Sequence, residues 1–318
     1  MKDSKKNWKK ILKTIYINGF LSNKKEVNNK LNFNKNVIDY VLIKSKKEKL
    51  FLKERYLIDL NSINLGKFAW LFVSVDRQNL DKNLFSKKIL KIINVHTIAE
   101  ITGNYDYAIK IIGSSIQNIN NIILTIEKIF PEIIDTEMHF VNKEFKTHFL
   151  KYENNQKKIL KKEDILILAE KEKNPLINLY EIAKKYSIHR NTVSNKWKKF
   201  WTNKILLKKT IELTPKGYEF IEMGLKSFII IKSTPGMQEK LIQKIIEEDK
   251  IQDIFTTIEN EIFLLIRTKD SDELAQFYET LAKKCPNIKK TNTIIFLTKK
   301  TKSGLGDKEV ELFIQKRN

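Results

Sequence analysis

The chain has 318 residues, of which 42% are hydrophobic, and its 60 Lys and Arg residues against 38 Asp and Glu residues give a formal net charge of +22. This length suffices for about two to four compact domains, and the charge favours polyanionic partners such as nucleic acids. The single cysteine, Cys285, excludes an intrachain disulfide and a thiolate zinc site, and the histidines show no metal-ligand spacing.

The sequence also argues against a membrane protein. No apolar run approaches the length of a membrane span, and the N-terminus, MKDSKKNWKK, lacks the apolar core of a signal peptide. We therefore expect a soluble, cytoplasmic protein without a membrane partner, a metal or another cofactor. The chain has no P-loop, no nucleophile elbow and no paired-carboxylate motif, so we predict no catalytic residues and no enzyme.

The segment before residue 60 predicts helices followed by a β-ribbon. Apolar residues recur at helical spacing over 8–18 and again over 35–47, and Ser22 is placed to cap a further helix between them. Gly19 stands where the first helix should end in a left-handed conformation. Residues 50–60 then read as the ribbon, so the segment has the pattern of a winged helix-turn-helix domain.

The last helix of this segment carries mixed signals for DNA contact. Its outward face includes Lys35 and Asn36, which can contact phosphates and bases, and also Asp39, whose charge would repel phosphates. Two roles for the helix over 35–47 therefore stay equally open: contact with DNA, or packing and dimerisation only.

Residues 68–143 show an alternating pattern of strands and amphipathic helices. The order β-α-β-β-α-β is the plan of a ferredoxin-like domain, with an antiparallel sheet covered by helices on one face. The strands are expected over 68–75, 95–102, 105–112 and 133–141, and the helices over 80–93 and 116–130. The first strand is apolar on both sides, so we expect the sheet to pack against a second sheet.

The segment 179–201 predicts two short helices joined by a tight turn. Leu179 and Ile182 give the first helix an apolar stripe, and Val193 and Trp197 do so for the second. The outward face of the second helix is rich in side chains that contact base edges and phosphates. The candidate DNA-contacting residues on it are Arg190, Asn191, Thr192, Ser194, Asn195, Lys196, Lys198 and Lys199.

A second β-ribbon is expected over 205–213, and Thr214 and Pro215 are placed to start another helix. A ribbon after a recognition helix makes a winged domain, in which Lys208 is expected to contact DNA phosphates. A helical hairpin with a solvated basic face is the plainer alternative, and we favour nucleic-acid binding.

The pattern of residues 68–143 recurs between residues 228 and 298. In both places a Pro-x-Ile sequence, at Pro131 and Pro286, starts the last strand after the second helix. We therefore predict an α+β fold in which two winged helix-turn-helix domains alternate with two ferredoxin-like (βαββαβ) α/β-sandwich domains, as an internal duplication. The expected domains span 1–63, 64–148, 149–224 and 225–300, followed by a charged tail over 301–318.

These features resemble the Lrp/AsnC (feast/famine) transcription regulators. The resemblance is carried by the turn at 101–107 (ITGNYDY), the second helix-turn-helix at 188–200, and the connector at 59–66. It implies a protein that binds double-stranded DNA and a small effector, commonly an amino acid. It also implies pairing through the ferredoxin-like domains, so a homodimer and a monomer acting as a pseudo-dimer are both open.

Carried over residue by residue, the resemblance makes Gly103, Tyr105 and Asp106 the candidate effector-binding residues, with Thr136 on the last strand. Gly103 permits close backbone approach, and Asp106 is expected to take an ammonium group. An ordinary hairpin turn, in which Asp106 only satisfies local N–H groups, is the alternative. The corresponding turn at 258–261 has no glycine and no Tyr-Asp pair, so we expect sensing in the first copy and DNA reading in the second.

Two other functions are open. The same domain plan is similar to the siroheme decarboxylases, which implies histidines and basic residues that bind a tetrapyrrole between the sheets. The segment 95–98 (VHTI) lacks the histidine–aromatic pattern expected of that family, so the histidines are interpreted as surface or packing residues. The third function is that of a protein whose helical domains serve only as dimer surfaces.

Overall fold

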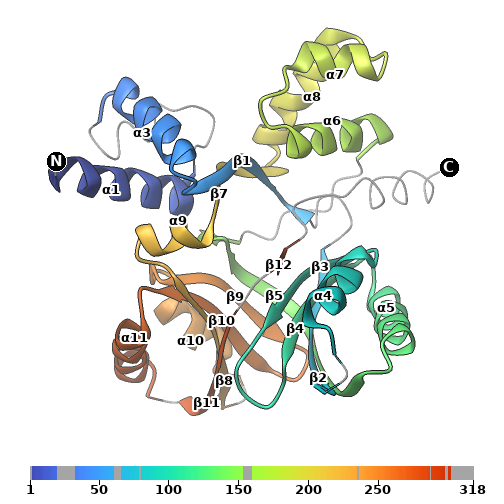
Figure 1. Ribbon diagram of the computed structural model, residues 1–318, viewed down its shortest axis with the longest axis vertical. Coiled ribbons are helices and arrows are strands. Elements are labelled where there is room, and N and C mark those ends of the chain that lie inside the picture. Colours follow the sequence, from blue (N-terminus) through green and yellow to red (C-terminus); the bar gives the residue numbers. More distant parts are fainter. Residues whose placement is uncertain are drawn as a thin grey trace. The chain divides into compact units, whose positions relative to one another are not determined.

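The computed structural model describes residues 2–19, 33–60, 66–78, 80–152, 160–234, 236–286, 288–297 and 300–301. These residues form two compact units, one within Met1–Ile63 and Asn155–Gly224 and the other within Asn64–Asn154 and Leu225–Leu312 (Figure 1). We call them the helical unit and the sheet unit. The helix expected after Ser22 and residues 302–318 of the charged tail lie outside the described residues.

The helical unit contains the helices that the sequence predicts on both sides of the first sheet region. Its elements are α1 (Lys2–Asn18), α3 (Lys35–Lys47), β1 (Phe51–Ile58), α6 (Lys162–Lys173), α7 (Leu179–Lys185), α8 (Arg190–Thr202), β7 (Leu206–Leu213) and α9 (Pro215–Phe220). Gly19 ends α1 with φ +71°, and its N–H donates to Ile15 O. Thr214 caps α9 through Gly217 N–H, with Pro215 at the start of the helix.

The two expected ribbons are single strands that pair with each other. β1 and β7 form an antiparallel two-stranded sheet, with Tyr56 opposite Lys209 and Arg55 opposite Thr210. The prediction that each half forms its own wing is therefore wrong, because the two strands pair with each other instead. The physical reason is that an edge strand leaves its backbone groups unpaired, and here the strand from the other half satisfies them.

Side chains from β7 complete the C-terminal end of α1. The carbonyls of a helix's last turn have no partner within the helix. Lys208 donates to Tyr16 O at 3.3 Å and Ile17 O at 2.6 Å, and the Thr210 hydroxyl donates to Ile15 O at 2.9 Å. The two halves of the helical unit are thus held together by backbone pairing and by buried hydrogen bonds.

The sheet unit contains the strands and helices of both βαββαβ runs. Its elements are β2 (Lys67–Val75), α4 (Lys82–Lys91), β3 (Val95–Glu100), β4 (Tyr107–Gly113), α5 (Ile116–Ile129), β5 (Ile133–Thr147), β6 (Leu150–Lys151), β8 (Leu225–Ser233), α10 (Gln238–Ile245), β9 (Ile251–Thr257), β10 (Glu261–Thr268), α11 (Ser271–Lys284), β11 (Ile288–Ile295) and β12 (Lys300–Thr301). Among the described residues the strand order is β11-β8-β10-β9-β5-β2-β4-β3-β12, with β6 on β5.

Strand β5 joins the two halves of this sheet. Its first part pairs with β2, and its extension beyond the expected end at residue 141 pairs with β9, where Val141 lies opposite Thr257. A second connection runs from β3 to the end of β11: Thr102 N–H donates to Ile295 O, and Leu297 N–H donates to Glu100 O. The halves therefore meet along both sides.

Apolar residues fill three layers. Aliphatic clusters lie between each half-sheet and its helices, around Ile109 in the first half and Leu264 in the second. Between the half-sheets lies an aromatic layer in which Trp70 packs edge-on against Phe228, with ring centroids 4.8 Å apart. This layer places the inner faces of β2 and β8 against each other, and the candidate cavity opens beside it.

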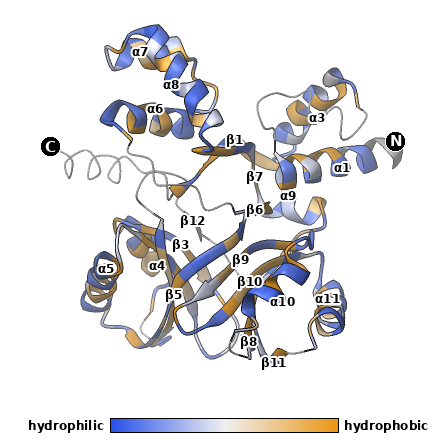
Figure 2. Cartoon of the chain, turned by 180° about the vertical axis from the view of Figure 1, so that it is seen from behind, coloured by the Kyte–Doolittle hydropathy of each residue, from blue (hydrophilic) through white to orange (hydrophobic). Residues whose placement is uncertain are grey.

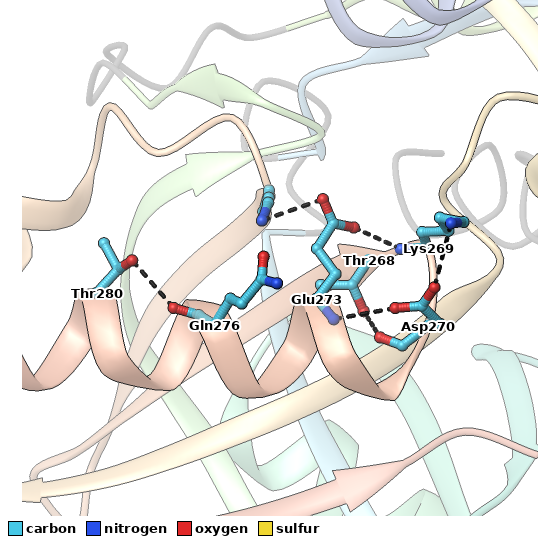
Figure 3. A network of polar contacts seen from close by, with 7 residues as sticks. Thr268, Lys269, Asp270, Glu273, Gln276 and Thr280 are labelled. Atoms are coloured by element: carbon cyan, nitrogen blue, oxygen red, sulfur yellow. Dashed lines mark hydrogen bonds and ion pairs between the residues drawn. The ribbon is translucent and has the colours of Figure 1, made fainter.

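Helix α11 has a polar outer face and a capped N-terminus. The side of α11 seen in Figure 2 is mostly hydrophilic, whereas Leu274 and Phe277 on its inner side are buried. Asp270 caps this helix by accepting from Glu273 N–H at 2.9 Å, and the Glu273 carboxylate accepts from Lys269 N–H (Figure 3). Such caps satisfy backbone donors that a helix leaves open.

Candidate functional site

The first candidate site is the exposed face of α8 in the helical unit. Val193 and Phe200 on this helix are buried, so the opposite face is directed outward. The exposed residues of the predicted set are Arg190, Asn191, Asn195, Lys198 and Lys199, and the half-buried ones are Thr192 and Ser194. These amide and cationic groups have the chemistry for base-edge and phosphate contacts.

Two lysines of the predicted set have other roles. Lys196 donates to Asp164 at 2.7 Å and lies 3.3 Å from Glu163, so it ties α8 to the start of α6. Lys208 is 1% exposed, and its ammonium is directed at the end of α1. The interpretation of Lys208 as a phosphate contact on a wing is therefore wrong, since the side chain is enclosed between the two halves.

The counterpart helix α3 offers a mixed surface. Its first turn is capped by Asn34, which accepts from Asn36 N–H at 3.2 Å, and Asn36 is exposed. Lys35 begins the helix, but its side chain is outside the described set. The exposed Tyr40 ring packs edge-on against Trp8 and lies 5.8 Å from the Lys44 ammonium. The face is thus partly used for contacts within its own half.

An aromatic cluster sets the position of α8. Tyr56 of β1 is 8% exposed, and its ring lies 5.1 Å from Trp197 and 6.2 Å from Trp201, edge-on to both. Burial raises the pKa of Tyr56 to about 12, with a further contribution from Glu54. A strand from the first half therefore supports the helix with the exposed polar face in the second half.

The second candidate site is a cavity of about 300 Å³ in the sheet unit. Both halves of the unit contribute to its wall. The first half contributes Phe72, Ile101, Thr102, Gly103, Asn104, Tyr105, Glu137 and His139. The second half contributes Ile230, Lys232, Glu261, Lys290, Thr291, Asn292 and Ile294. The size falls at the lower end of the range for small-molecule sites.

A chain of charged groups crosses one end of the cavity. His139 Nε2 lies 3.4 Å from Glu137 Oε1, and His139 Nδ1 lies 3.3 Å from Glu261 Oε2. Glu261 Oε1 in turn lies 3.1 Å from Lys232 Nζ. The contact with His139, followed by that with Lys232, outweighs burial and lowers the pKa of Glu261. The imidazole thus lies between carboxylates from two different strands.

The wall next to this chain is aromatic and aliphatic. The His139 ring packs between Phe72 and Phe263, with centroids 4.9 Å and 5.0 Å away. The Tyr105 ring lies 6.0 Å from Phe72. Burial raises the pKa of Tyr105, and the nearby Glu137 raises it further. The cavity can therefore hold a ligand with an apolar body and a polar end.

The predicted effector residues separate into two pairs. Gly103 and Tyr105 line the cavity, and Gly103 has φ +110° with open space where a Cβ would lie. Asp106 accepts from Val75 N–H at 2.9 Å and from Arg77 Nε at 2.7 Å, and it is not part of the wall. Thr136 donates to Glu127 at 3.1 Å and also lies outside the wall. The alternative of a locally satisfied turn thus describes Asp106.

Sequence reasoning missed the polar chain at the end of the cavity. The prediction of a surface or packing residue holds for His139 in part, because the side chain is 5% exposed and packs between Phe72 and Phe263, but it also lines the cavity. The available signal was the spacing of Glu137 and His139, which are two apart on one strand and therefore share a face. Their partners on β8 and β10 are remote in sequence, and only strand pairing brings them near.

No group of three or more His, Cys, Asp or Glu in the described residues has the arrangement to hold a metal ion. None of the described helices combines the length and apolar character needed to cross a membrane.

Comparisons with known proteins link part of the chain to transcription regulators. Residues 69–150 match the family described as Lrp/AsnC ligand binding domain. The chain is 28% identical over 134 residues to the HTH-type transcriptional regulator FL11 of Pyrococcus abyssi, covering 42% of this chain and 84% of the relative. The regulator of the same name from Pyrococcus furiosus is 26% identical over 127 residues, covering 40% and 82%. These matches support the Lrp/AsnC resemblance.

Comparison of structures gives a match over the whole length. The siroheme decarboxylase NirDL has a TM-score of 0.63 at 13% identity, covering 97% of each chain. Its co-complex with an iron-uroporphyrin III analogue has the same TM-score at 12% identity, covering 98% of this chain and 100% of the other. At this identity the likeness concerns the fold. The prediction that excluded an enzyme is wrong, because the fold of the entire chain occurs in one.

Proposed function

We propose that this chain is a DNA-binding transcription regulator of Lrp/AsnC type, in which α8 enters the major groove of double-stranded DNA. The observation that carries the proposal is the outward face of α8, where Arg190, Asn191 and Asn195 are exposed together. Arg and Asn form bidentate hydrogen bonds with base edges, each worth about 1–3 kcal/mol of discrimination. The Lrp/AsnC domain match and the FL11 relatives support the same class.

The paired halves suggest how the regulator is organised. We infer two winged helix-turn-helix domains and two ferredoxin-like domains that arose by tandem duplication, so that one chain resembles a dimer. The β1–β7 pairing and the contacts of Lys208 with α1 join the two halves of the helical unit. The cavity of the sheet unit then serves a small effector, in contact with Gly103 and Tyr105. Two such chains can pair to extend the DNA site.

A DNA titration tests the proposal. Genomic fragments, including the promoter of the protein's own gene, are titrated at several salt concentrations. We expect fragment-selective binding whose log affinity falls linearly with log salt, because lysines displace counterions from phosphates. Replacing Arg190 and Asn195 by Ala should reduce the preference among fragments, whereas Lys283→Ala, an exposed lysine on α11, is the control. Weak binding that is indifferent to the fragment would refute sequence-specific regulation.

A second function is favoured by the whole-chain fold match to siroheme decarboxylase. Decarboxylation replaces a carboxylate by hydrogen and therefore needs a proton donor at the reacting carbon. We propose His139 for that role, because its imidazole lines a cavity that also contains Lys232 and Lys290 as partners for carboxylates. Adding siroheme should then shift its visible absorbance and release carbon dioxide, and the release of carbon dioxide should fail in His139→Ala while the absorbance shift persists. An unchanged spectrum would exclude this function.

A further inference from the structure

Helices α3 and α8 occupy equivalent positions in the two halves of the helical unit. Each has 13 residues, and each follows a residue whose side chain accepts from a backbone N–H of the first turn, Asn34 before α3 and His189 before α8. Each is also followed by a left-handed residue, Lys49 with φ +57° and Lys204 with φ +54°. The two helices therefore have the same register, and their side chains can be compared position by position.

The outward faces of the two helices differ in chemistry. Large apolar side chains of α3 stand where α8 has polar ones: Val37 for Thr192, Tyr40 for Asn195 and Ile43 for Lys198. We call Val37, Tyr40 and Ile43 the α3 stripe; their exposed fractions are 40%, 53% and 59%. Their spacing places them on one side of the helix, opposite the buried Ile38 and Leu42. The first half thus presents an apolar surface where the second half presents amide and cationic groups.

The α3 stripe is a preformed surface. Single exposed apolar side chains are common on proteins, whereas contiguous ones mark binding surfaces. The Tyr40 ring has a defined position, because it lies edge-on to Trp8 of α1 with the ring centroids 6.1 Å apart. The Lys44 ammonium lies 5.8 Å from the centre of the same ring. The stripe therefore offers a partner an apolar surface that is already ordered.

The charges around the stripe favour a polyanionic partner. Lys46, Lys47 and Lys49 are exposed at the C-terminal end of α3 and outnumber Glu48 there. Protein–protein interfaces are depleted in lysine, whereas lysine is a usual contact of DNA phosphates. Asp39, a half-buried acid on the border of the stripe, is compatible with base contact, because a carboxylate accepts a hydrogen bond from cytosine N4. An apolar stripe with a lysine-rich end therefore fits DNA better than it fits another protein.

Thymine carries the group that such a stripe recognises. The C5 methyl of thymine is an apolar group in the major groove, and apolar side chains contact it, whereas Arg and Asn pair with guanine and adenine. The amide and cationic groups of α8 therefore suit purines, and the alkyl and aryl groups of α3 suit thymines.

We propose that α3 is a second DNA recognition helix, whose stripe of Val37, Tyr40 and Ile43 packs against the C5 methyl groups of thymines in a half-site of its own. This inference rests on the proposed DNA-binding function and names the chemistry that the first half recognises. Palindromic sites match two identical recognition helices. Because α3 and α8 present different faces, the DNA site of this chain is non-palindromic, with a thymine-containing half-site in addition to the one that α8 reads.

Replacing thymine by uracil tests the proposal, because uracil keeps the base pair and lacks only the methyl group. A genomic fragment that the wild type binds selectively is prepared with thymine or with uracil throughout, and both forms are titrated with the full chain. Burying one methyl group changes affinity by about fourfold, so contacts with two or more methyl groups predict at least about tenfold weaker binding to the uracil DNA. Equal affinity for the two forms overturns the proposal.

Variants assign the effect to α3. The double variant Val37→Ala with Ile43→Ala truncates exposed side chains and should keep the fold. We expect its thymine-to-uracil affinity ratio to be at least about threefold smaller than that of the wild type. Leu124→Ala, which truncates an exposed leucine of α5 in the sheet unit, is the matched control and should keep the wild-type ratio. A double variant with the wild-type ratio overturns the assignment, because the methyl contacts would then belong to another element, such as Thr192 of α8.

The position of the uracil separates this inference from the proposed function. Uracil placed in one helical turn at a time, about 10 base pairs, should weaken binding mainly in one turn. Asn195→Ala on α8 should lower the affinity for thymine and uracil DNA alike. A loss that is spread evenly over all turns contradicts contact by α3. A chain that binds no fragment selectively refutes both proposals, whereas selective binding that is indifferent to uracil refutes only the role of α3. The uracil comparison needs no substitution, so it decides the matter if the double variant does not fold.

Discussion

Glu261 and Asp106 occupy the same register position in the two halves of the sheet unit, yet they make different contacts. Tyr107 of β4 pairs with Val73 of β2, and Ile262 of β10 pairs with Ile231 of β8. These two pairs are equivalent in the two halves, so the residues that precede Tyr107 and Ile262 are equivalent as well. Asp106 holds the loop after β2 through Val75 and Arg77, whereas Glu261 lies against His139 in the cavity. A single register position thus stabilises a loop in one half and lines the cavity in the other.

This division predicts the effect of removing Asp106. Asp106→Ala loses a hydrogen bond to Val75 N–H and the ion pair with Arg77, which is mostly exposed. We expect the free energy of unfolding to fall by about 1–2 kcal/mol, most of it from the backbone hydrogen bond. Urea denaturation measures this loss. A free energy of unfolding equal to that of the wild type would mean that these contacts of Asp106 do not stabilise the loop after β2.

Lys198 and Lys208 should show opposite behaviour although both belong to the predicted DNA surface. Lys198 is exposed on α8, so Lys198→Ala should leave stability within about 0.5 kcal/mol and lower the salt slope of DNA binding by about one. Lys208 is buried on α1, so Lys208→Met should reduce stability by about 1–3 kcal/mol and leave the slope unchanged. Denaturation and salt-dependent DNA titration of both variants check the pair. A lower slope for Lys208→Met in a folded protein would contradict the burial argument.

Local patterns predicted the elements of the sheet unit well because each strand and helix buries its own periodic face. The pattern over 116–130 gave α5, which begins at Ile116 and ends at Ile129. The extension of β5 to Thr147 was not predictable in this way. Glu144 and Lys146 interrupt the apolar pattern, and their partners Phe255 and Ile254 lie far along the chain. Pairing between remote strands, rather than local propensity, decides this part of the fold.

The same limit explains the candidate sites. The exposed face of α8 was predictable, since residues on one helix share a face by spacing alone. The cavity was only half predictable: Gly103 and Tyr105 belong to a local turn motif, but Glu261 reaches His139 from β10, and Lys232 reaches Glu261 from β8. Likewise nothing local reveals that Lys208 is enclosed by α1 of the other half. Charged residues change role when a remote segment covers them.

Tyr56 should couple the two halves of the helical unit. Tyr56→Ala removes the ring that packs against Trp197 and Trp201, and we expect a loss of about 3–5 kcal/mol in the free energy of unfolding. Tyr56→Phe keeps the ring and should stay within about 1 kcal/mol of the wild type. Urea denaturation followed by tryptophan fluorescence measures both. DNA affinity of the folded fraction should fall in Tyr56→Ala and persist in Tyr56→Phe, and equal stability of both variants would remove Tyr56 from this role.

Glu261 predicts a defined acid dependence of stability. The contact with His139, then that with Lys232, holds its pKa below the ordinary value of 4.5 despite burial. A carboxyl whose pKa is lower in the folded state stabilises the protein above its unfolded pKa, and this contribution is lost as pH falls through the folded pKa. The wild type should therefore lose stability relative to Glu261→Gln as pH falls below about 4.5. Urea midpoints of both proteins between about pH 7 and pH 3 give the comparison. If the difference between the two urea midpoints stays constant across that range, Glu261 has the same pKa in the folded and unfolded chains. That result would contradict the assignment of a lowered pKa to Glu261 through its contact with His139.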